Sequence, residues 1–366
     1  MSLQCGIVGL PNVGKSTLFN ALTAAKAEAA NYPFCTIDPN VGVVTVPDPR
    51  MAQISQHIQP QKQIPTTIEF VDIAGLVAGA SKGEGLGNQF LANIRETDAI
   101  VHVVRCFDDS NVVHVSGSID PLRDIDVINT ELMLADLDTV EKRLKRIEKV
   151  VQASKDPKLK TEHQLLKRLY DLLSEGKPAR SLQAEDAELP ILRELHLLTS
   201  KPTLYACNVS EEDFSAGKSA YVDLVQQRAD SESNKCLMIC SALEAEIALL
   251  DPSERQEFLQ SLGASEPGLH RLIRESYALL NLITYFTAGE KEVRAWTIPQ
   301  GTKAPQSAGV IHSDFEKGFI RAETYHCEDL FELKSESAVK EAGRYRSEGK
   351  DYVVKDGDVL FFRFNV

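Results

Sequence analysis

GLPNVGKS, residues 9 to 16, decides the fold of this chain. It matches the pattern G-x-x-x-x-G-K-[ST], follows an apolar stretch typical of a strand and begins a helical stretch, the context that a phosphate-binding loop needs. Lys15 would add positive charge at the β- and γ-phosphates, and the Ser16 hydroxyl is placed to bind Mg²⁺. Backbone N–H groups of the loop surround phosphates. The residues expected to contact a nucleotide here are Asn12, Val13, Gly14, Lys15, Ser16 and Thr17.

The third predicted strand ends in a second nucleotide motif, D-x-x-G, at residues 72–75. Asp72 would bind Mg²⁺ through water, and Gly75 would move to the γ-phosphate and join Lys15 as a catalytic group. Glycine is frequent from Gly75 to residue 87, which predicts a switch that becomes ordered on the triphosphate; the alternative is a floppy loop. In the stretch N-Y-P-F-C-T-I-D, Thr36 is expected to complete the Mg²⁺ coordination.

Working outward from the loop, strand-like and helical stretches alternate, which favours an α/β fold with a parallel sheet. This pattern covers residues 1–120 and 197–282, and together they form the predicted P-loop domain. Residues 121–196 interrupt it with apolar residues at heptad spacing and a second apolar stripe, typical of an antiparallel helical coiled-coil hairpin. Residues 283–366 read as a small α+β module with the C-terminus in its sheet.

Composition excludes several classes of protein. The 366 residues carry a net charge of −13, so the chain does not coat nucleic acid in general and no DNA partner is expected. Residues 141–170 nevertheless hold ten Lys or Arg against four Asp or Glu, a basic patch that suits a phosphate backbone or is simply a solvated helical face. No apolar stretch is long enough to span a membrane. Seven scattered cysteines indicate reduced thiols and a cytoplasmic location.

Several motifs together resemble the YchF family of Obg-like P-loop proteins: G-L-P-N-V-G-K-S, N-Y-P-F-C-T-I-D-P-N, D-I-A-G-L-V and, near the C-terminus, T-Y-F-T-A-G-E-K-E-V-R-A-W-T-I-P. The resemblance covers essentially the whole chain. It implies a G domain with an inserted coiled coil and a C-terminal TGS domain of ubiquitin-like β-grasp shape. It further implies an ATPase that prefers ATP to GTP and associates with ribosomes as a translation factor.

The stretch LYACNVSEED, residues 204–213, lies where a P-loop GTPase carries N-K-x-D. Asn208 is retained, but Val209 replaces the Lys that covers the base, and Glu211 replaces the Asp that guanine requires. Asparagine can bond the N6/N7 edge of adenine in bidentate fashion, so the motif predicts an adenine reader. The alternative is that Asn208 only caps a turn. After the next predicted strand, Ser241, Ala242 and Leu243 resemble the loop whose backbone contacts the base in P-loop GTPases.

Hydrolysis is expected to be slow, because Leu76 stands where Ras-like enzymes place the glutamine that orients water. His114 is the candidate replacement, as the resemblance also implies; the alternative is a solvent-exposed loop histidine. His102, in mid-strand, reads as a core residue.

Asn12 stands where potassium-stimulated relatives bind K⁺, or else it stabilises the loop. Cys35 adjoins the Mg²⁺-binding threonine, so its oxidation would disturb the metal if the thiol is exposed and acidic.

Three kinds of function fit these motifs. The first is a nucleotide-dependent switch that binds ATP and Mg²⁺, hydrolyses ATP slowly and contacts the ribosome through the hairpin and the TGS module. The second is a GTPase of the Obg type, or an adaptor in which the bound nucleotide only sets the conformation. The adaptor stays possible because Leu76 cannot orient a water molecule. The third is a P-loop phosphotransferase, which the D-x-x-G motif and the base-reading strand end argue against.

Overall fold

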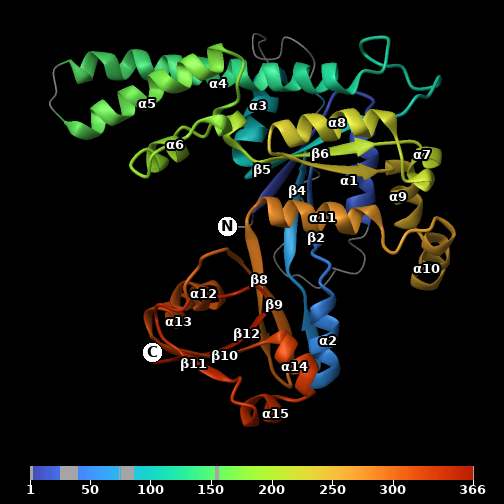
Figure 1. Ribbon diagram of the computed structural model, residues 1–366, viewed down its shortest axis with the longest axis vertical. Coiled ribbons are helices and arrows are strands. Elements are labelled where there is room, and N and C mark those ends of the chain that lie inside the picture. The colour runs from blue at the N-terminus through green and yellow to red at the C-terminus, as the bar shows by residue number, and fades with distance from the viewer. Residues whose placement is uncertain (1–2, 25–39, 74, 76–85, 153–155, 366) are drawn as a thin grey trace. The chain divides into compact units, whose positions relative to one another are not determined.

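The computed structural model describes residues 3–24, 40–73, 75, 86–152 and 156–365. The chain divides into two compact units, one of Met1–Val43 with Glu69–Leu272 and one of Val44–Ile68 with Ile273–Val366. Two six-stranded sheets form their frameworks (Figure 1). Among the helices described, none is both long and apolar enough to cross a membrane.

The first sheet has the strand order β2-β4-β1-β5-β6-β7, and its neighbours from β4 to β7 are parallel. All residues of β5 and β6 are buried, as expected for parallel strands covered on both faces. The strands are β1 (Gln4–Val8), β2 (Val41–Thr45), β4 (Thr67–Asp72), β5 (Ala99–Arg105), β6 (Thr203–Asn208) and β7 (Lys235–Ile239). The helices are α1 (Lys15–Ala24), α3 (Leu86–Glu96), α7 (Glu211–Ala216), α8 (Ala220–Ser231), α9 (Ser241–Ile247) and α10 (Pro252–Ser261), while α11 (Gly268–Leu279) begins in the first unit and ends in the second. This confirms the predicted α/β fold.

Helices α4 (Pro121–Val151) and α5 (Pro157–Ser174) form the predicted hairpin within the first unit (Figure 1). Each begins with a proline after an aspartate, Asp120 or Asp156, whose side chain accepts a backbone N–H of the first turn. The short segments α6 (Leu189–Glu194), η2 (Ala179–Ser181) and η3 (Leu198–Ser200) follow. Both apolar stripes meet in one core, whose buried members are Val140, Ile147, Leu165, Leu166, Leu169, Leu173, Ala179 and Leu197.

A buried carboxylate fixes the hairpin to the sheet. Asp136 of α4 accepts backbone N–H bonds from Leu198 at 2.7 Å and from Thr199 at 2.8 Å, and the Thr199 hydroxyl donates a third at 2.7 Å. These two residues lie in η3, just before β6. The contact therefore positions the strand that ends at Asn208.

The second sheet has the order β11-β10-β12-β8-β9-β3 and apolar clusters on both faces. Its strands are β3 (Lys62–Ile64), β8 (Leu282–Ala288), β9 (Glu292–Pro299), β10 (Phe319–His326), β11 (Arg346–Glu348) and β12 (Asp358–Phe364). Its helices are α2 (Pro49–Ile58), α12 (Ala304–Ile311), α13 (Ser313–Lys317), α14 (Cys327–Leu333) and α15 (Glu336–Glu341). The C-terminal strand lies inside this α+β module, as the sequence predicted.

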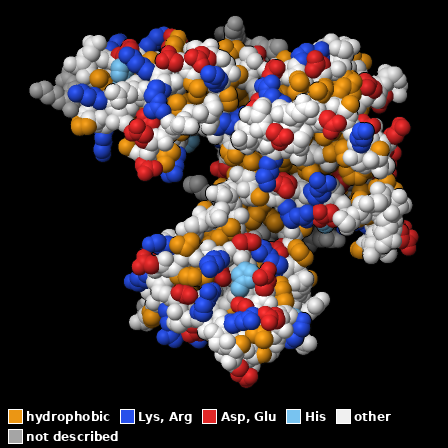
Figure 2. Space-filling model, viewed as in Figure 1, with side chains coloured by type: hydrophobic (Ala, Val, Ile, Leu, Met, Phe, Trp, Pro, Cys, Tyr) orange, Lys and Arg blue, Asp and Glu red, His pale blue; other side chains and the backbone are white. Residues whose placement is uncertain are grey.

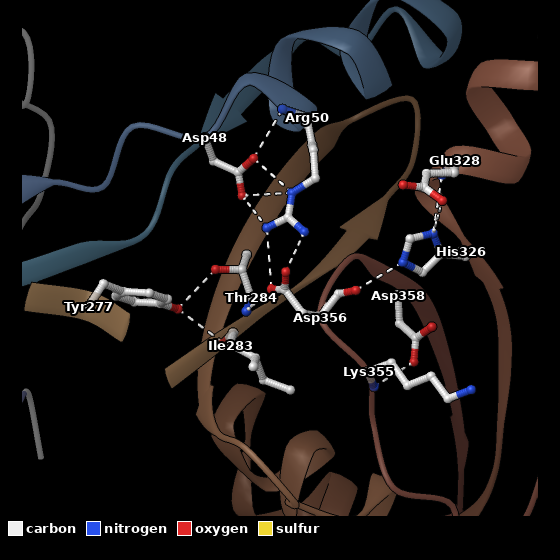
Figure 3. Close-up of polar contacts among 10 residues, drawn as sticks. All are labelled: Asp48, Arg50, Tyr277, Ile283, Thr284, His326, Glu328, Lys355, Asp356 and Asp358. Atoms are coloured by element: carbon white, nitrogen blue, oxygen red, sulfur yellow. Dashed lines mark hydrogen bonds and ion pairs between the residues drawn. The ribbon is translucent and has the colours of Figure 1, made fainter. Parts of the chain in front are cut away.

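The segment 44–68 belongs to this second unit, which corrects the prediction that all of residues 1–120 lie in the P-loop domain. Strand β3 pairs in parallel with β9, and α2 packs Met51 and Ile54 into the core of the second sheet. Arg50 binds Asp48 and also Asp356, 2.7 Å away, whose other carboxylate oxygen accepts the Thr284 N–H (Figure 3). Long-range pairing of this kind leaves no local sequence signal.

His102 of β5 is a buried core residue, as predicted, and its ring lies 5.6 Å from that of Tyr205. Burial disfavours the charged ring and lowers its pKa from 6.5 to about 4. Between pH 6.5 and about 4, the His102 ring therefore binds a proton in the unfolded chain but not in the folded chain. Stability is complete above pH 6.5 and is lost as the pH falls from 6.5 toward 4, by about 3 kcal/mol in total.

Urea unfolding at pH 7.0, 5.5 and 4.5 measures this loss. A His102→Gln variant lacks the titrating ring, so its pH profile should be flatter over this window by the same amount. Parallel profiles for the two proteins would contradict the assignment.

Candidate nucleotide-binding site

The phosphate loop connects β1 to α1, and α1 begins at Lys15. Gly14 has a φ of +91°, and a Cβ built on it would lie 2.1 Å from Nδ2 of Asn208. Only glycine fits this conformation and this space. The loop is therefore closed against the end of β6, the strand that carries the candidate base reader.

Lys15 and Asp72 come together at this loop. The Lys15 ammonium forms an ion pair and hydrogen bond with the carboxylate of Asp72, at the end of β4, and both side chains are largely buried. Gly75 lies against the loop as well, because a Cβ there would be 3.4 Å from the backbone N of Pro11. The hydroxyl residues Ser16 and Thr17 are exposed at the start of α1. The arrangement joins the two predicted motifs in one site.

Asn208 connects three segments of the site. Its Nδ2 donates to the Val13 carbonyl and its Oδ1 accepts from the Ser241 N–H, both at 2.9 Å. This leaves one N–H of the amide for a base, since asparagine has two. The oxygen has a second lone pair, so the predicted bidentate contact with the adenine N6/N7 edge stays a prediction. A single donor to N7 remains compatible with the geometry.

The other predicted base-contact residues are spread around Asn208. The Val209 side chain is only 3% exposed and packs in the core, and its N–H bonds the Ile239 carbonyl at 2.9 Å. It presents no side chain to a base. Glu211 is exposed in the first turn of α7. Within α9, Ala242 is exposed and Leu243 is buried. The buried Ser241 hydroxyl has no hydrogen-bond partner among the residues described.

His114 lies in the loop between β5 and α4, and it is buried instead of exposed. Its Nε2 lies 2.8 Å from Oδ2 of Asp124, and its Nδ1 accepts the Ser116 N–H at 3.1 Å. The loop touches the phosphate loop directly, because Nδ2 of Asn12 donates to the Val113 carbonyl at 3.1 Å. Sequence reasoning found His114 but missed Asp124, which has no motif to mark it.

Three predicted residues, Thr36, Cys35 and Leu76, lie outside the described residues. Within the described ranges, no group of three or more His, Cys, Asp or Glu residues is arranged to hold a metal. Ser16 and Asp72 are hard oxygen donors beside the phosphate loop, which suits Mg²⁺ bound mainly by phosphates and water. These residues fit the ion that the fold implies.

A parallel sheet with a phosphate loop after its first strand, a D-x-x-G motif at the end of β4 and an asparagine bridging loop and base strand defines a P-loop nucleoside triphosphatase fold. The model of the 50S ribosome-binding GTPase family matches residues 4–159. The model of the YchF GTPase C-terminal family, described as a protein of unknown function, matches residues 282–365. The chain belongs to the YchF family, as its full-length relatives show.

Those relatives are named ribosome-binding ATPase YchF. The protein from Escherichia coli O157:H7 is 58% identical over 366 residues, and the one from Bacillus subtilis (strain 168) is 55% identical over 367, with both chains fully covered. The structure of the Schizosaccharomyces pombe YchF GTPase superposes with a TM-score of 0.90 at 41% identity, covering 99% of this chain and 98% of that one. A GTP binding protein from Pyrococcus horikoshii OT3, at a TM-score of 0.60 and 19% identity, shares the fold.

Proposed function

We propose that this protein is a nucleotide-dependent switch that binds ATP with Mg²⁺, hydrolyses it slowly and acts on the ribosome in the cytoplasm. The observation that carries the proposal is the phosphate loop with Lys15 already paired to Asp72, beside a base strand without the guanine clamp. Curated relatives over the full length are named ribosome-binding ATPases.

The phosphates would be held by the backbone of the loop and by Lys15, which must leave Asp72 to reach them. Ser16, Thr36 and, through water, Asp72 would hold Mg²⁺, which neutralises the charge that develops on the phosphates. Asn12 would contribute to a K⁺ site, and equal hydrolysis rates in Na⁺ and K⁺ would exclude that part. This chain supplies position and charge, and water supplies the nucleophile.

The preference for ATP follows from what Val209 and Glu211 lack. No Lys stem covers the base, and the longer Glu211 does not place its carboxylate where guanine N1–H and the 2-amino group need it. Loss of such a paired contact costs ~1–3 kcal/mol. Asn208 keeps one donor for N7, which both purines share.

Calorimetric affinities for ATP and GTP, measured side by side with phosphate release, test this proposal. We expect ATP to bind about tenfold tighter and to release phosphate slowly, since a loss of ~1.4 kcal/mol is tenfold. Glu211→Asp should reduce the ratio of ATP affinity to GTP affinity. Glu212→Asp, in the same turn, is the matched control and should leave this ratio unchanged. Tighter binding of GTP would support a GTPase of the Obg type instead. Transfer of phosphate to an added acceptor would indicate a phosphotransferase.

Slow hydrolysis is expected because Leu76 offers no amide to orient water. His114 is the proposed group that orients the water, and the hydrogen bond between Asn12 and Val113, which joins its loop to the phosphate loop, supports this role. The adaptor alternative predicts tight ATP binding with no phosphate release above that of a Lys15→Ala variant.

The surface proposed to contact the ribosome includes the hairpin and the second unit. A groove of about 450 Å³ on the hairpin side of the first unit is lined by the basic residues Arg95, Lys142, Arg143 and Arg146 among acidic ones, and Figure 2 shows Lys and Arg side chains along the hairpin. In the second unit, the Arg363 guanidinium lies 4.6 Å from the centre of the exposed Phe361 ring. Basic and aromatic side chains together suit unpaired RNA.

Ribosome binding should weaken with salt if the hairpin contacts phosphates. Lys142→Glu with Lys145→Glu is expected to lower ribosome affinity by roughly tenfold and to reduce the salt slope by about one per lost contact. Lys218→Glu, an exposed change elsewhere in the first unit, is the control. Pelleting assays at several KCl concentrations measure both effects. Binding that is independent of salt would exclude docking through this patch.

A further inference from the structure

At the tip of the loop between β5 and α4, two apolar side chains are exposed and the polar side chain between them is buried. Val113 is 75% exposed and Val115 is 52% exposed, whereas the polar His114 between them is only 7% exposed. Folded chains bury valine more often than histidine. Something specific must therefore keep His114 inside.

Asp124, in the first turn of α4, supplies that contact. Its Oδ2 lies 2.8 Å from Nε2 of His114, and both side chains are 4% exposed. Its Oδ1 accepts from Arg123 at 3.3 Å, so the carboxylate is fixed from the other side. Because Nδ1 of His114 accepts the Ser116 N–H, the proton of the ring sits on Nε2 and is donated to Asp124. Neither ring nitrogen is available to a water molecule.

The base of the loop is fixed while its tip is held by few contacts. Arg105 of β5 is buried and donates to the carbonyls of Phe107, Asp109 and Val112, at 3.2, 3.3 and 3.0 Å. Beyond Val112, the hydrogen bond from Asn12 holds the Val113 carbonyl to the phosphate loop. A change at Asn12 is thus transmitted first to the residue next to His114.

We propose that Asp124 is a positioning residue for hydrolysis, which holds His114 in an inactive orientation until nucleotide binding at the phosphate loop releases it. On release, the tip turns, so that Val113 and Val115 move inward and His114 moves out with Nδ1 free to accept a hydrogen bond from water. The inference rests on the proposed role of His114, and it adds the residue that controls when His114 acts. Slow hydrolysis in the isolated protein then follows from the small released fraction.

The test compares steady-state ATP hydrolysis of the full chain with that of Asp124→Ala. We expect kcat to rise by about tenfold with KM unchanged, because a lost charge-assisted hydrogen bond shifts a two-state equilibrium by roughly that factor. Asp126→Ala, an exposed aspartate in the same helix that pairs with Arg228, should leave kcat as it is. In a His114→Ala background, Asp124→Ala should have no effect, since it acts through His114.

A spectroscopic readout keeps the test independent of activity and of reduced stability in Asp124→Ala. Histidine ring ¹⁵N spectra, with His114→Ala for assignment, should show the Nε2–H tautomer in nucleotide-free protein, and the Nε2–H signal should shift with a non-hydrolysable ATP analogue as its hydrogen bond to Asp124 breaks. Asp124→Asn, which keeps the shape, should give a smaller rise in kcat. An unchanged or lower kcat in both variants, or ring signals unaffected by the analogue, would overturn the inference. Wild-type hydrolysis by His114→Ala would instead refute the proposed role of His114 itself.

Discussion

Gly14→Ala is expected to lower the affinity for ATP by ~100-fold or more, since an added Cβ costs ~1–2 kcal/mol in this backbone conformation and displacing the Asn208 bonds costs a further ~1–3 kcal/mol. The physical cause is the 2.1 Å approach to Nδ2 of Asn208 at a φ of +91°. Moving Asn208 breaks its hydrogen bonds to Val13 and Ser241, so the phosphate loop and the end of β6 are no longer held in fixed positions relative to each other.

The matched control is Gly217→Ala. Gly217 also has a positive φ, +64°, but nothing lies within 4 Å of a Cβ built there. It ends α7, so the change should cost only ~1 kcal/mol of stability and leave ATP affinity intact. Calorimetric titration with ATP compares the two variants. Equal affinities would mean that the Gly14 contact does not organise the site.

Val209→Lys is expected to destabilise the fold by ~3–5 kcal/mol, because an unpaired charge would be buried in an apolar core. Val209 packs there with Cys207 and Leu243, and its backbone continues the ladder to β7. The substitution looks, from the sequence, like restoration of the N-K-x-D motif. In the structure position 209 lies inside the core, so the variant should lose stability without gaining GTP affinity.

Urea unfolding followed by circular dichroism measures this loss. Glu212→Lys, an exposed residue in the first turn of α7, changes charge without burial and should cost less than ~1 kcal/mol. A stable Val209→Lys protein that binds GTP more tightly than ATP would show that the strand end rearranges readily.

The site was predictable where chemistry is encoded by close spacing along the chain. The loop around Gly14 and Lys15 and the motif at Asp72 follow from fixed patterns, and their strands end where expected. The orientation of His114 was not predictable, because its partner Asp124 comes from a separate helix and no period links the two. The bonds of Asn208 were also hidden, since its partners Val13 and Ser241 lie far along the chain on either side.

The fold shows the same division. The strands of the first sheet follow the apolar stretches whose alternation with helical stretches predicted the α/β fold. The second unit was predicted only as a small α+β module over residues 283–366, and its short strands β3 and β11, of three residues each, leave no pattern of their own. Strand β3 has three residues, and only its pairing with β9 makes it a strand. Tertiary pairing decided these elements, not local propensity.

The place of segment 44–68 in the second unit has a consequence for how this protein can be divided. A cut anywhere near residue 282 would strip the partners from Met51 and Ile54 and leave Arg50 without Asp356, while the released C-terminal piece would lack the strand at its sheet edge. Each unit is built from two separate segments of the chain, so neither can be removed as one continuous domain. Fragments divided at residue 282 should therefore both be less stable than the intact chain, because each loses contacts that the other supplies.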